Sequence, residues 1–321
     1  MTALLVLLSM PMLYVSQASE KAAVLRQAGI EQFYVPPEEV EQWKIAGLQP
    51  APLSISDLRA RTRLKVPGVA PNIRTASPTR RPWVNASGWL FLREASAGKY
   101  YYDLPRGKAT LAAAEAFVYG ADAILKIDPD DVPDASAMLA FLKQIEPDRM
   151  EPLADLAVVE SDSPLLEEVL NLLVRRNLMF RLVQKPDPRF AINVQIGSAE
   201  YPASEAENPS NLALKVRRKL SDENRLLRIY GSEVVIGRVT GDASRIRLHL
   251  INYGANVIGG LRVRLRGSCI ANYAQAVGKG RIDLEDFTAR AGITEFTIPE
   301  MPTYVVVDLS KSIEPQRHKG H

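Results

Sequence analysis

The chain has 321 residues, of which 46% are apolar and 24% charged, so it is long enough to bury the cores of about two domains. Near-average contents of glycine and proline and a single cysteine exclude collagen-like, disordered and disulfide-stabilised classes. No run reaches the roughly 18 apolar residues of a membrane span, and the net charge of +3 argues against a purely electrostatic partner. Composition therefore predicts a globular, multidomain protein without a stable membrane span.

Few residues are available for nucleophilic or metal chemistry. The histidines are His249, His318 and His321, and the last two lie in a polar tail. Cys269 and His249 both fall in a region patterned like β-strands, where we expect a core thiol and a buried histidine. The chain has no G-x-S-x-G elbow, no phosphate-binding glycine motif and too few ligands for a zinc site. We therefore predict no metal and no cofactor, and any catalysis would depend on carboxylates.

An apolar run from Ala3 to Val15 opens the chain and is followed by the small-x-small sequence Ser16–Ala18. This pattern is typical of a secretory signal, so residues 1–18 are predicted to be a signal peptide and the protein to be periplasmic or secreted. No lysine or arginine precedes the run, and Pro11 interrupts it. The alternative is that Ala3–Ser9 forms the first buried strand of an α/β domain.

Residues 19–150 alternate between helix and strand patterns. The helices that we expect are Lys21–Ala28, 36–46, Ala109–Tyr119 and Asp134–Ile145, and the strands are Glu31–Val35, Leu48–Ser54, Trp83–Arg93 and Ala121–Ile127. Alternation at this spacing predicts parallel strands joined by helices. Because a full eight-fold barrel needs about 250 residues, we predict a partial or shortened (β/α) barrel.

Two further parts follow. Residues 151–232 are predicted to form a small doubly wound α/β domain, with strands at Leu153–Glu160, Met179–Val183, Ile192–Ile196 and Leu226–Tyr230 and helices at Leu165–Arg176 and Asn211–Leu220. Asn177 is expected to end the first of these helices in a left-handed conformation. Residues 233–311 alternate with a period of two and predict an antiparallel β-sandwich, and 312–321 form a polar tail. The predicted fold class is therefore α/β plus all-β.

Three phrases in this order resemble a known family. They are AEAFVYGADA at 114–123, LAVVE at 156–160, and the closing pair TEFTIP and TYVVVDL at 294–299 and 303–309. The order of parts is similar to that of bacterial glycoside-hydrolase-like proteins organised like the family 42 β-galactosidases. The resemblance implies a TIM barrel, a glutamine-amidotransferase-like domain, a C-terminal β-sandwich and action on carbohydrate. Two departures are that the barrel part has about half the usual length and that no cysteine follows a strand of the amidotransferase-like part.

Glycoside hydrolysis usually needs two carboxyl groups, about 5–5.5 Å apart for retention or about 6.5–9.5 Å for inversion. Asp128 directly follows the predicted strand Ala121–Ile127, which is where barrel sites lie, so it is the first catalytic candidate. The alternative is an acidic turn before the next helix. Glu115, in an alanine-rich helix, is the second candidate, and its alternative is a glutamate on the helix surface. The sequence does not place these two acids within the required distance.

Aromatic and polar side chains gather between residues 83 and 93. On an uninterrupted strand, Trp83, Asn85, Trp89 and Arg93 would share one face. Aromatic rings stack on the C–H surfaces of sugars, and amide and guanidinium groups donate to hydroxyls, so this set predicts a carbohydrate-binding site. Tyr34, near the end of an earlier strand, is added to it. The alternative is that the tryptophans belong to the core.

Residues 215–270 are basic, with twelve lysines and arginines against four acids. Arg262, Arg264 and Arg266 alternate along one predicted strand, which predicts either a surface for polyanions or lipid headgroups, or a face that is solvated or docked against the rest of the chain. Aromatic residues are not interleaved with these cations, so we predict no nucleic-acid partner.

The sequence favours an exported glycoside-hydrolase-like protein that acts on carbohydrate through acid/base carboxylates. The alternative is a non-catalytic carbohydrate-binding or assembly module on a degenerate hydrolase scaffold. The position of Cys269 argues against an amidotransferase. The predicted partner is carbohydrate, and formation of a homo-oligomer is left open.

Overall fold

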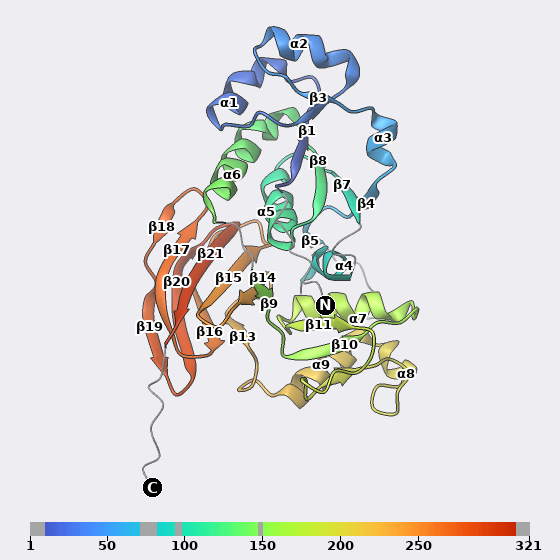
Figure 1. Cartoon of the computed structure of the whole chain (residues 1–321), viewed down its shortest axis with the longest axis vertical. Coiled ribbons are helices and arrows are strands. Elements are labelled where there is room, and N and C mark those ends of the chain that lie inside the picture. Colours follow the sequence, from blue (N-terminus) through green and yellow to red (C-terminus); the bar gives the residue numbers. More distant parts are fainter. Residues whose placement is uncertain (1–9, 71–81, 94–97, 147–149, 313–321) are drawn as a thin grey trace.

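A computed structural model describes residues 10–70, 82–93, 98–146 and 150–312. Figure 1 shows an α/β part at the top, a β-sandwich at the left and a smaller α/β part at the lower right. This arrangement confirms the predicted fold class of α/β plus all-β. Residues 1–9 of the predicted signal peptide and 313–321 of the predicted tail lie outside the described residues.

The first part contains an open sheet of six parallel strands in the order β3-β2-β1-β8-β7-β4. The strands are β1 (Met12–Tyr14), β2 (Tyr34–Val35), β3 (Ala51–Pro52), β4 (Thr62–Leu64), β7 (Lys99–Asp103) and β8 (Asp122–Lys126). β1 pairs with β8, as the first and last strands of a closed barrel do, whereas the sheet ends at β3 and β4. The predicted partial barrel is confirmed, because within the described ranges the ring of strands is open between β3 and β4.

Helices pack mainly on the outer face of this sheet (Figure 1). They are η1 (Ser19–Lys21), α1 (Ala22–Gln27), η2 (Pro37–Glu39), α2 (Val40–Ile45), α5 (Ala109–Tyr119), η3 (Pro129–Asp131) and α6 (Val132–Gln144). In contrast, α3 (Ile55–Arg59) places Leu58 in the buried cluster of Tyr14 and Tyr101 on the other face. α5 is buried on nearly all sides because it lies between the sheet and the sandwich, where the ring of Phe117 is 6.5 Å from that of Tyr304. Gly120, with φ of 64°, follows the last residue of this helix, so the helix has the predicted bounds.

β1, the strand at the centre of the sheet, lies inside the predicted signal peptide. Leu13 and Val15 are fully buried, and Tyr14 pairs with both neighbouring strands. The alternative first strand, Ala3–Ser9, lies outside the described residues. Cleavage after Ala18 would remove β1. A chain cleaved there could therefore not form this sheet with its central strand.

The segment from 83 to 93 is not a single strand, contrary to the prediction. β6 (Trp83–Asn85) pairs antiparallel with β5 (Gly68–Ala70), and α4 (Gly88–Arg93) follows two residues later. Gly88 is required at the start of this helix because a Cβ there would lie 2.4 Å from Cζ of Tyr119. The prediction that four functional side chains share one strand face is therefore wrong, since the chain turns into a helix before Trp89.

The smaller α/β part has three parallel strands in the order β11-β10-β12. Its elements are β10 (Leu156–Val159), α7 (Leu165–Arg175), β11 (Phe180–Val183), β12 (Asn193–Val194), α8 (Ala203–Ala206) and α9 (Pro209–Leu220). Asn177 takes φ of 53° just after α7, as predicted. Its side-chain Nδ2 donates to the Val235 carbonyl at 3.0 Å, and its Oδ1 accepts from the Gly237 N–H at 2.7 Å. This amide therefore fastens the smaller part to the sandwich.

The sandwich consists of two antiparallel sheets, β13-β16-β20-β19 and β18-β17-β21-β15-β14-β9. The strands are β9 (Glu151–Pro152), β13 (Leu227–Tyr230), β14 (Val235–Gly241), β15 (Arg245–Asn252), β16 (Ile258–Arg266), β17 (Cys269–Ala276), β18 (Gly280–Ile282), β19 (Glu285–Arg290), β20 (Ile293–Met301) and β21 (Tyr304–Lys311). The prediction of Leu226–Tyr230 as a strand of the smaller α/β part is wrong. β13 pairs with β16, because fully buried Leu227 packs in the sandwich core.

Cys269 and His249 are both buried, as expected. Cys269 is 1% exposed, and burial raises the pKa of its thiol. His249 is also 1% exposed, and its Nδ1 lies 2.7 Å from the Tyr304 hydroxyl. Cys269 lies in the sandwich core, whereas His249 lies on the opposite face of β15 from Leu248 and Leu250, where Tyr304 packs against α5 and α6.

Candidate functional site

Glu115 lies on α5 and is completely buried. Its carboxylate accepts hydrogen bonds from the Ser87 backbone N–H at 2.7 Å, the Tyr102 hydroxyl at 2.5 Å and the Tyr253 hydroxyl at 2.6 Å. Burial raises the pKa of this carboxyl, and the three hydrogen bonds oppose the rise. The alternative of a surface glutamate is wrong, because sheet and sandwich enclose the helix.

Glu115 also lies on the outer side of the open sheet. Its partner Tyr102 belongs to the face of β7 that packs against α5, whereas Tyr101 belongs to the inner face. Barrel enzymes place their catalytic groups at the C-terminal ends of the strands. A substrate would reach Glu115 only if the layer between sheet and helix opened.

Asp128 lies just beyond the C-terminal end of β8, as predicted. Its half-buried carboxylate accepts the Asp130 backbone N–H at 2.9 Å and thereby caps η3. Asp130 forms ion pairs with Lys21 at 3.3 Å and Arg106 at 3.0 Å. Asp128 and Glu115 thus belong to different hydrogen-bonded groups, and the catalytic role of each stays a prediction.

The inner face of the open sheet carries tyrosines and an ion-paired acid. Tyr34, which is half-buried, lies level with Tyr14 on the neighbouring strand, and both pack with Tyr101. Asp103, at the end of β7, accepts a hydrogen bond from Lys126 at 2.7 Å. Sequence reasoning missed Asp103, although its position after three consecutive tyrosines at a strand end was a readable signal.

Trp83 and Asn85 are both half-buried on β6. The indole Nε1 of Trp83 donates to Oδ1 of Asn85 at 3.1 Å, so these two predicted ligand-binding residues contact each other. The guanidinium of Arg175 lies over the Trp83 ring, 4.2 Å from its centroid. Trp83 also lines a pocket.

Trp89 and Arg93 lie on α4, away from the residues that line this pocket. Trp89 packs against the main core, in line with the alternative stated for the tryptophans. Arg93 donates from Nε to Glu160 at 2.7 Å and from Nη1 to Glu167 at 3.3 Å. Arg93 therefore links the two α/β parts, and the structure does not bring it next to Trp83.

The pocket has a volume of about 560 Å³, within the range of small-molecule sites. It lies between the C-terminal end of α7, the N-terminal end of α9, β13 and the residues around Trp83. Two exposed glutamates, Glu207 and Glu233, line it. We name it the arginine pocket because five arginines line it: Arg175, Arg176, Arg217, Arg225 and Arg228.

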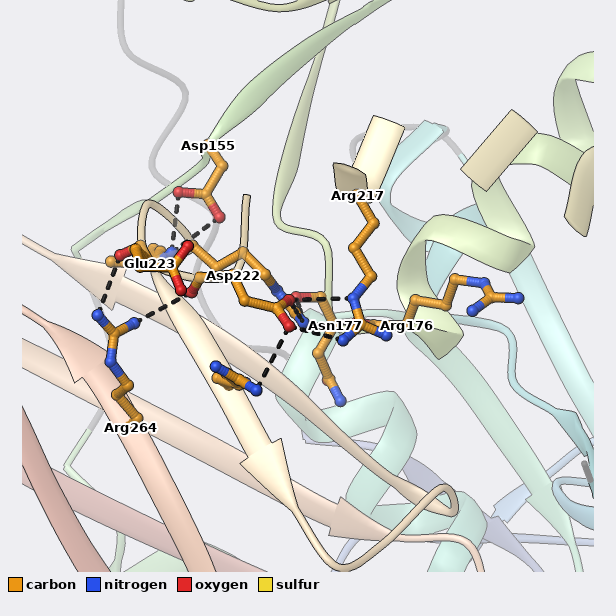
Figure 2. Close-up of polar contacts among 10 residues, drawn as sticks. Asp155, Arg176, Asn177, Arg217, Asp222, Glu223 and Arg264 are labelled. Atoms are coloured by element: carbon orange, nitrogen blue, oxygen red, sulfur yellow. Dashed lines mark hydrogen bonds and ion pairs between the residues drawn. The ribbon is translucent and has the colours of Figure 1, made fainter. Parts of the chain in front are cut away.

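Asp222 holds three of these arginines in place (Figure 2). Arg217 donates to both carboxylate oxygens, at 3.0 and 2.8 Å. Arg225 and Arg228 each add one contact, at 3.1 and 3.3 Å. Hydrogen bonding by Arg217 is the main cause that holds the pKa of Asp222 well below its usual range. Arg264 fixes the same loop by donating to the backbone carbonyls of Asp222 and the next residue, at 3.3 and 3.0 Å.

Two arginines of the pocket keep an unused donor. Arg225 is 5% exposed and donates from Nη2 to the carbonyls of Arg176 and Asn177 at 2.8 and 3.2 Å, but its Nε has no hydrogen-bond partner in the described part of the chain. Arg175 donates from Nη2 to the Pro82 carbonyl at 2.9 Å, and its Nε likewise finds no partner among the described residues. Burial, and then the charge of Arg176, lower the pKa of Arg175 to about 10.

Sequence reasoning found the basic stretch but not the pocket. Arg217, Arg225 and Arg228 belong to that stretch, whereas Arg175 and Arg176 come from α7 and meet them only in the folded chain. No sequence spacing signals this meeting.

The predicted arginine stripe on β16 is largely used for internal contacts. Arg262 forms an exposed pair with Glu295 at 2.6 Å. Arg264 and Arg266 donate to backbone carbonyls of the loop 222–224. Of the stated alternatives, docking against the rest of the chain is confirmed for these two residues.

Clusters of metal ligands and membrane-spanning helices are both absent from the described ranges. These residues contain no group of three or more His, Cys, Asp or Glu side chains that could hold a metal ion. No helix among them is long and apolar enough to cross a membrane.

The chain is similar in structure to several solved glycoside hydrolases. Alpha-L-fucosidase isoenzyme 2 from Paenibacillus thiaminolyticus matches with a TM-score of 0.51 and 10% identity, over 85% of this chain and 70% of that one. The GH42 beta-galactosidase Gan42B from G. stearothermophilus, as a catalytic mutant, matches with a TM-score of 0.37 and 8% identity, over 78% of this chain and 53% of that one. The beta-galactosidase from Rahnella sp. R3 matches with a TM-score of 0.39 and 10% identity, over 87% of this chain and 63% of that one.

No family model matches the sequence, and no curated protein matches it. The likeness to the fucosidase shows that this chain has a glycoside-hydrolase-like scaffold. At 10% identity such a likeness establishes the fold and not an activity.

Proposed function

We propose that the protein binds carbohydrate without hydrolysing it, on a glycoside-hydrolase-like scaffold. The observation that carries this proposal is the contrast between its two polar centres. The arginine pocket is lined by Trp83 and by many hydrogen-bond donors, whereas Glu115 is enclosed by three donors of its own.

Neutral amide and hydroxyl groups line the pocket in addition to the charged arginines. Side chains of Asn208, Ser210 and Ser232 line it beside Trp83. Amide and hydroxyl groups both donate and accept hydrogen bonds, which matches the hydroxyl groups of sugars. This set therefore suits a saccharide better than a purely apolar ligand.

The carboxyl groups of these two centres do not favour hydrolysis. A general acid relies on an enclosed carboxyl with a raised pKa that still touches the glycosidic oxygen. Glu115 is enclosed, but it is completely buried between helix and sheet. Glu207 and Glu233 are in the pocket, but both are exposed. Binding is the simpler role for such a site.

Titration calorimetry of the full chain with a panel of oligosaccharides, paired with an assay for released reducing ends, tests this proposal. We expect affinity without turnover. Trp83→Ala should weaken binding, and Tyr34→Ala, a matched aromatic change on the inner face of the sheet, should leave it unchanged. Steady release of reducing ends, or no affinity for any saccharide in the panel, would overturn the proposal.

A second candidate function is hydrolysis at the inner face of the sheet. It is favoured by one observation, which is that Asp103 and Asp128 follow the adjacent strands β7 and β8 at their C-terminal ends. Turnover of aryl glycosides that is lost in both Asp103→Asn and Asp128→Asn, and kept in a folded Glu115→Gln variant, would support this function over simple binding.

Export to the periplasm or beyond is a further proposal, based on the apolar run Ala3–Val15. A chain that begins at Ser19 lacks β1 and should not fold, so the N-terminus of an exported, folded form should precede Met12. Cell fractionation followed by N-terminal sequencing checks this. A folded, exported form that begins at Ser19 would contradict it.

We also propose that the smaller α/β part is amidotransferase-like in fold and has no amidotransferase activity. Support comes from its resemblance at residues 156–160 and from the burial of Cys269 inside the sandwich. Release of ammonia from glutamine by the full chain would contradict this proposal.

A further inference from the structure

The arginine pocket holds more positive charge than its acids neutralise. Its five arginines face two lining glutamates, Glu207 and Glu233, and the adjacent Asp222. Asp222 is shared by three guanidinium groups, and both glutamates are exposed to solvent, which weakens their pairing. At neutral pH the lining therefore keeps a surplus of about two positive charges.

Two of these guanidinium groups stack on neighbouring aromatic rings. The Trp83 ring lies under Arg175, and the Tyr230 ring lies under Arg228 at 4.6 Å. With these faces covered, the cations present their edges, where the N–H donors are. A guanidinium edge is shaped for the two oxygens of a carboxylate, sulfate or phosphate group.

The surrounding backbone adds to this preference for anions. α9 has twelve residues and begins at the pocket, where Asn208, Pro209 and Ser210 line it. The N-terminal end of a helix carries a partial positive charge. Arg225, which is 95% buried, keeps its Nε without a partner in the described part of the chain. The helix terminus and the Arg225 guanidinium therefore both add positive potential around the pocket.

We propose that the arginine pocket binds an anionic saccharide, a sugar that bears a carboxylate or sulfate group. This inference rests on the proposed carbohydrate-binding function and names its substrate class. The anionic group contacts the edges of Arg175 and Arg228, and the hydroxyl groups of the sugar contact Ser210 and Asn208.

The dimensions of the site favour a sugar over a bare ion. A volume of about 560 Å³ is far larger than one inorganic anion needs and falls within the range for small organic ligands. The lining also supplies neutral amide and hydroxyl groups that both donate and accept hydrogen bonds, which matches the hydroxyl groups of a sugar.

The test is calorimetric titration of the full chain with four matched probes. These are trigalacturonate, its fully methyl-esterified form, a sulfated disaccharide and inorganic phosphate. We expect the two acidic saccharides to bind. The methyl ester should be about tenfold to a hundredfold weaker because it loses hydrogen bonds to a charged group, and phosphate should be weaker because it lacks the hydroxyl contacts of the sugar.

Variants of the arginines locate the effect. Arg175→Gln and Arg228→Gln should each weaken trigalacturonate about tenfold, with little change for the methyl ester. Arg218→Gln is the matched control, because Arg218 is an exposed cation on α9 that does not line the pocket. Circular dichroism confirms that each variant is folded. If Arg175→Gln fails to fold, Arg228→Gln, whose side chain is 29% exposed, decides the outcome.

The outcomes separate the two proposals. Equal affinity for the acid and its methyl ester overturns the anionic class and leaves carbohydrate binding in place. Binding of phosphate alone, or of none of the probes, also overturns the anionic class, and carbohydrate binding itself falls only if the oligosaccharide panel shows no affinity either. Acid-selective binding that is unchanged in both arginine variants overturns the placement of the site in this pocket.

Discussion

Glu115 and the arginine pocket differ in how fully their charged groups are hydrogen-bonded within the protein. Glu115 is fully buried, and three donors from different parts of the chain surround it. The arginines of the pocket share few acids, and Arg175 and Arg225 each keep an Nε without a hydrogen-bond partner among the described residues. The comparison shows that a buried acid on a hydrolase-like scaffold stabilises the fold when donors of the protein itself occupy its acceptor oxygens. A ligand-binding site, in contrast, must keep some hydrogen-bonding groups that are not satisfied within the protein.

Replacing Glu115 should have the largest effect on stability. Glu115→Leu leaves the hydroxyls of Tyr102 and Tyr253 and the Ser87 N–H without an acceptor, so we expect the free energy of unfolding to fall by about 3–5 kcal/mol. Urea unfolding at pH 7 measures this change. Glu115→Gln, which keeps size and part of the hydrogen bonding, should cost less. A loss below about 1 kcal/mol for the leucine variant would show that the cluster is not a structural centre.

Replacing Asp222 should have an intermediate effect that depends on pH. Its folded pKa is depressed, so its contribution to stability is present above the unfolded pKa of about 4 and is lost as the pH falls toward the folded value. We expect Asp222→Asn to cost about 1–3 kcal/mol at pH 7, because three arginines lose a charged partner, and clearly less near pH 3. Urea unfolding at both pH values gives the comparison. A cost that is the same at pH 7 and pH 3 would contradict this account.

Asp155 should show the opposite pH dependence with a smaller effect. It accepts the Leu226 N–H at 3.0 Å and lies 3.3 Å from Arg266, yet burial raises its pKa to about 6. Between pH of about 4 and 6 the folded state binds more protons than the unfolded state, so stability falls as the pH rises through this window. Asp155→Asn should remove this fall in the free energy of unfolding, which is on the order of 1–2 kcal/mol across the window. Identical stability–pH curves for wild type and variant would show that Asp155 does not titrate in this range.

Local patterns in the sequence predicted much of the fold. Ala109–Tyr119 formed the expected helix, and Asn177 took the expected left-handed conformation, because helix propensity and helix ends are decided within a few residues. The prediction of a strand at Trp83–Arg93 was wrong because the local structure there depends on a tertiary contact. Gly88, at the start of the helix, must fit against Tyr119. The placement of Leu227 was wrong for the same reason, because a short apolar strand fits either sheet until its partner is known.

The candidate site was less predictable than the fold. Trp83 was selected from its chemistry and does line a pocket, but the arginines that surround it come from α7, α9 and β13. Glu115 was selected as an acid in an alanine-rich helix, and only the packing of Tyr253 from the sandwich shows that its oxygens are occupied. Residues that come together from three parts of a chain have no characteristic sequence spacing, so a sequence pattern does not reveal their contact.

The most direct test of the central claim is arginine footprinting with phenylglyoxal and mass spectrometry, with and without saturating trigalacturonate. The partly exposed side chains of Arg217 and Arg228, at 32% and 29% exposure, should be protected by the saccharide, while exposed Arg218 should react at an unchanged rate. Unchanged labelling of Arg217 and Arg228 at saturation would contradict the claim that the arginine pocket is the binding site.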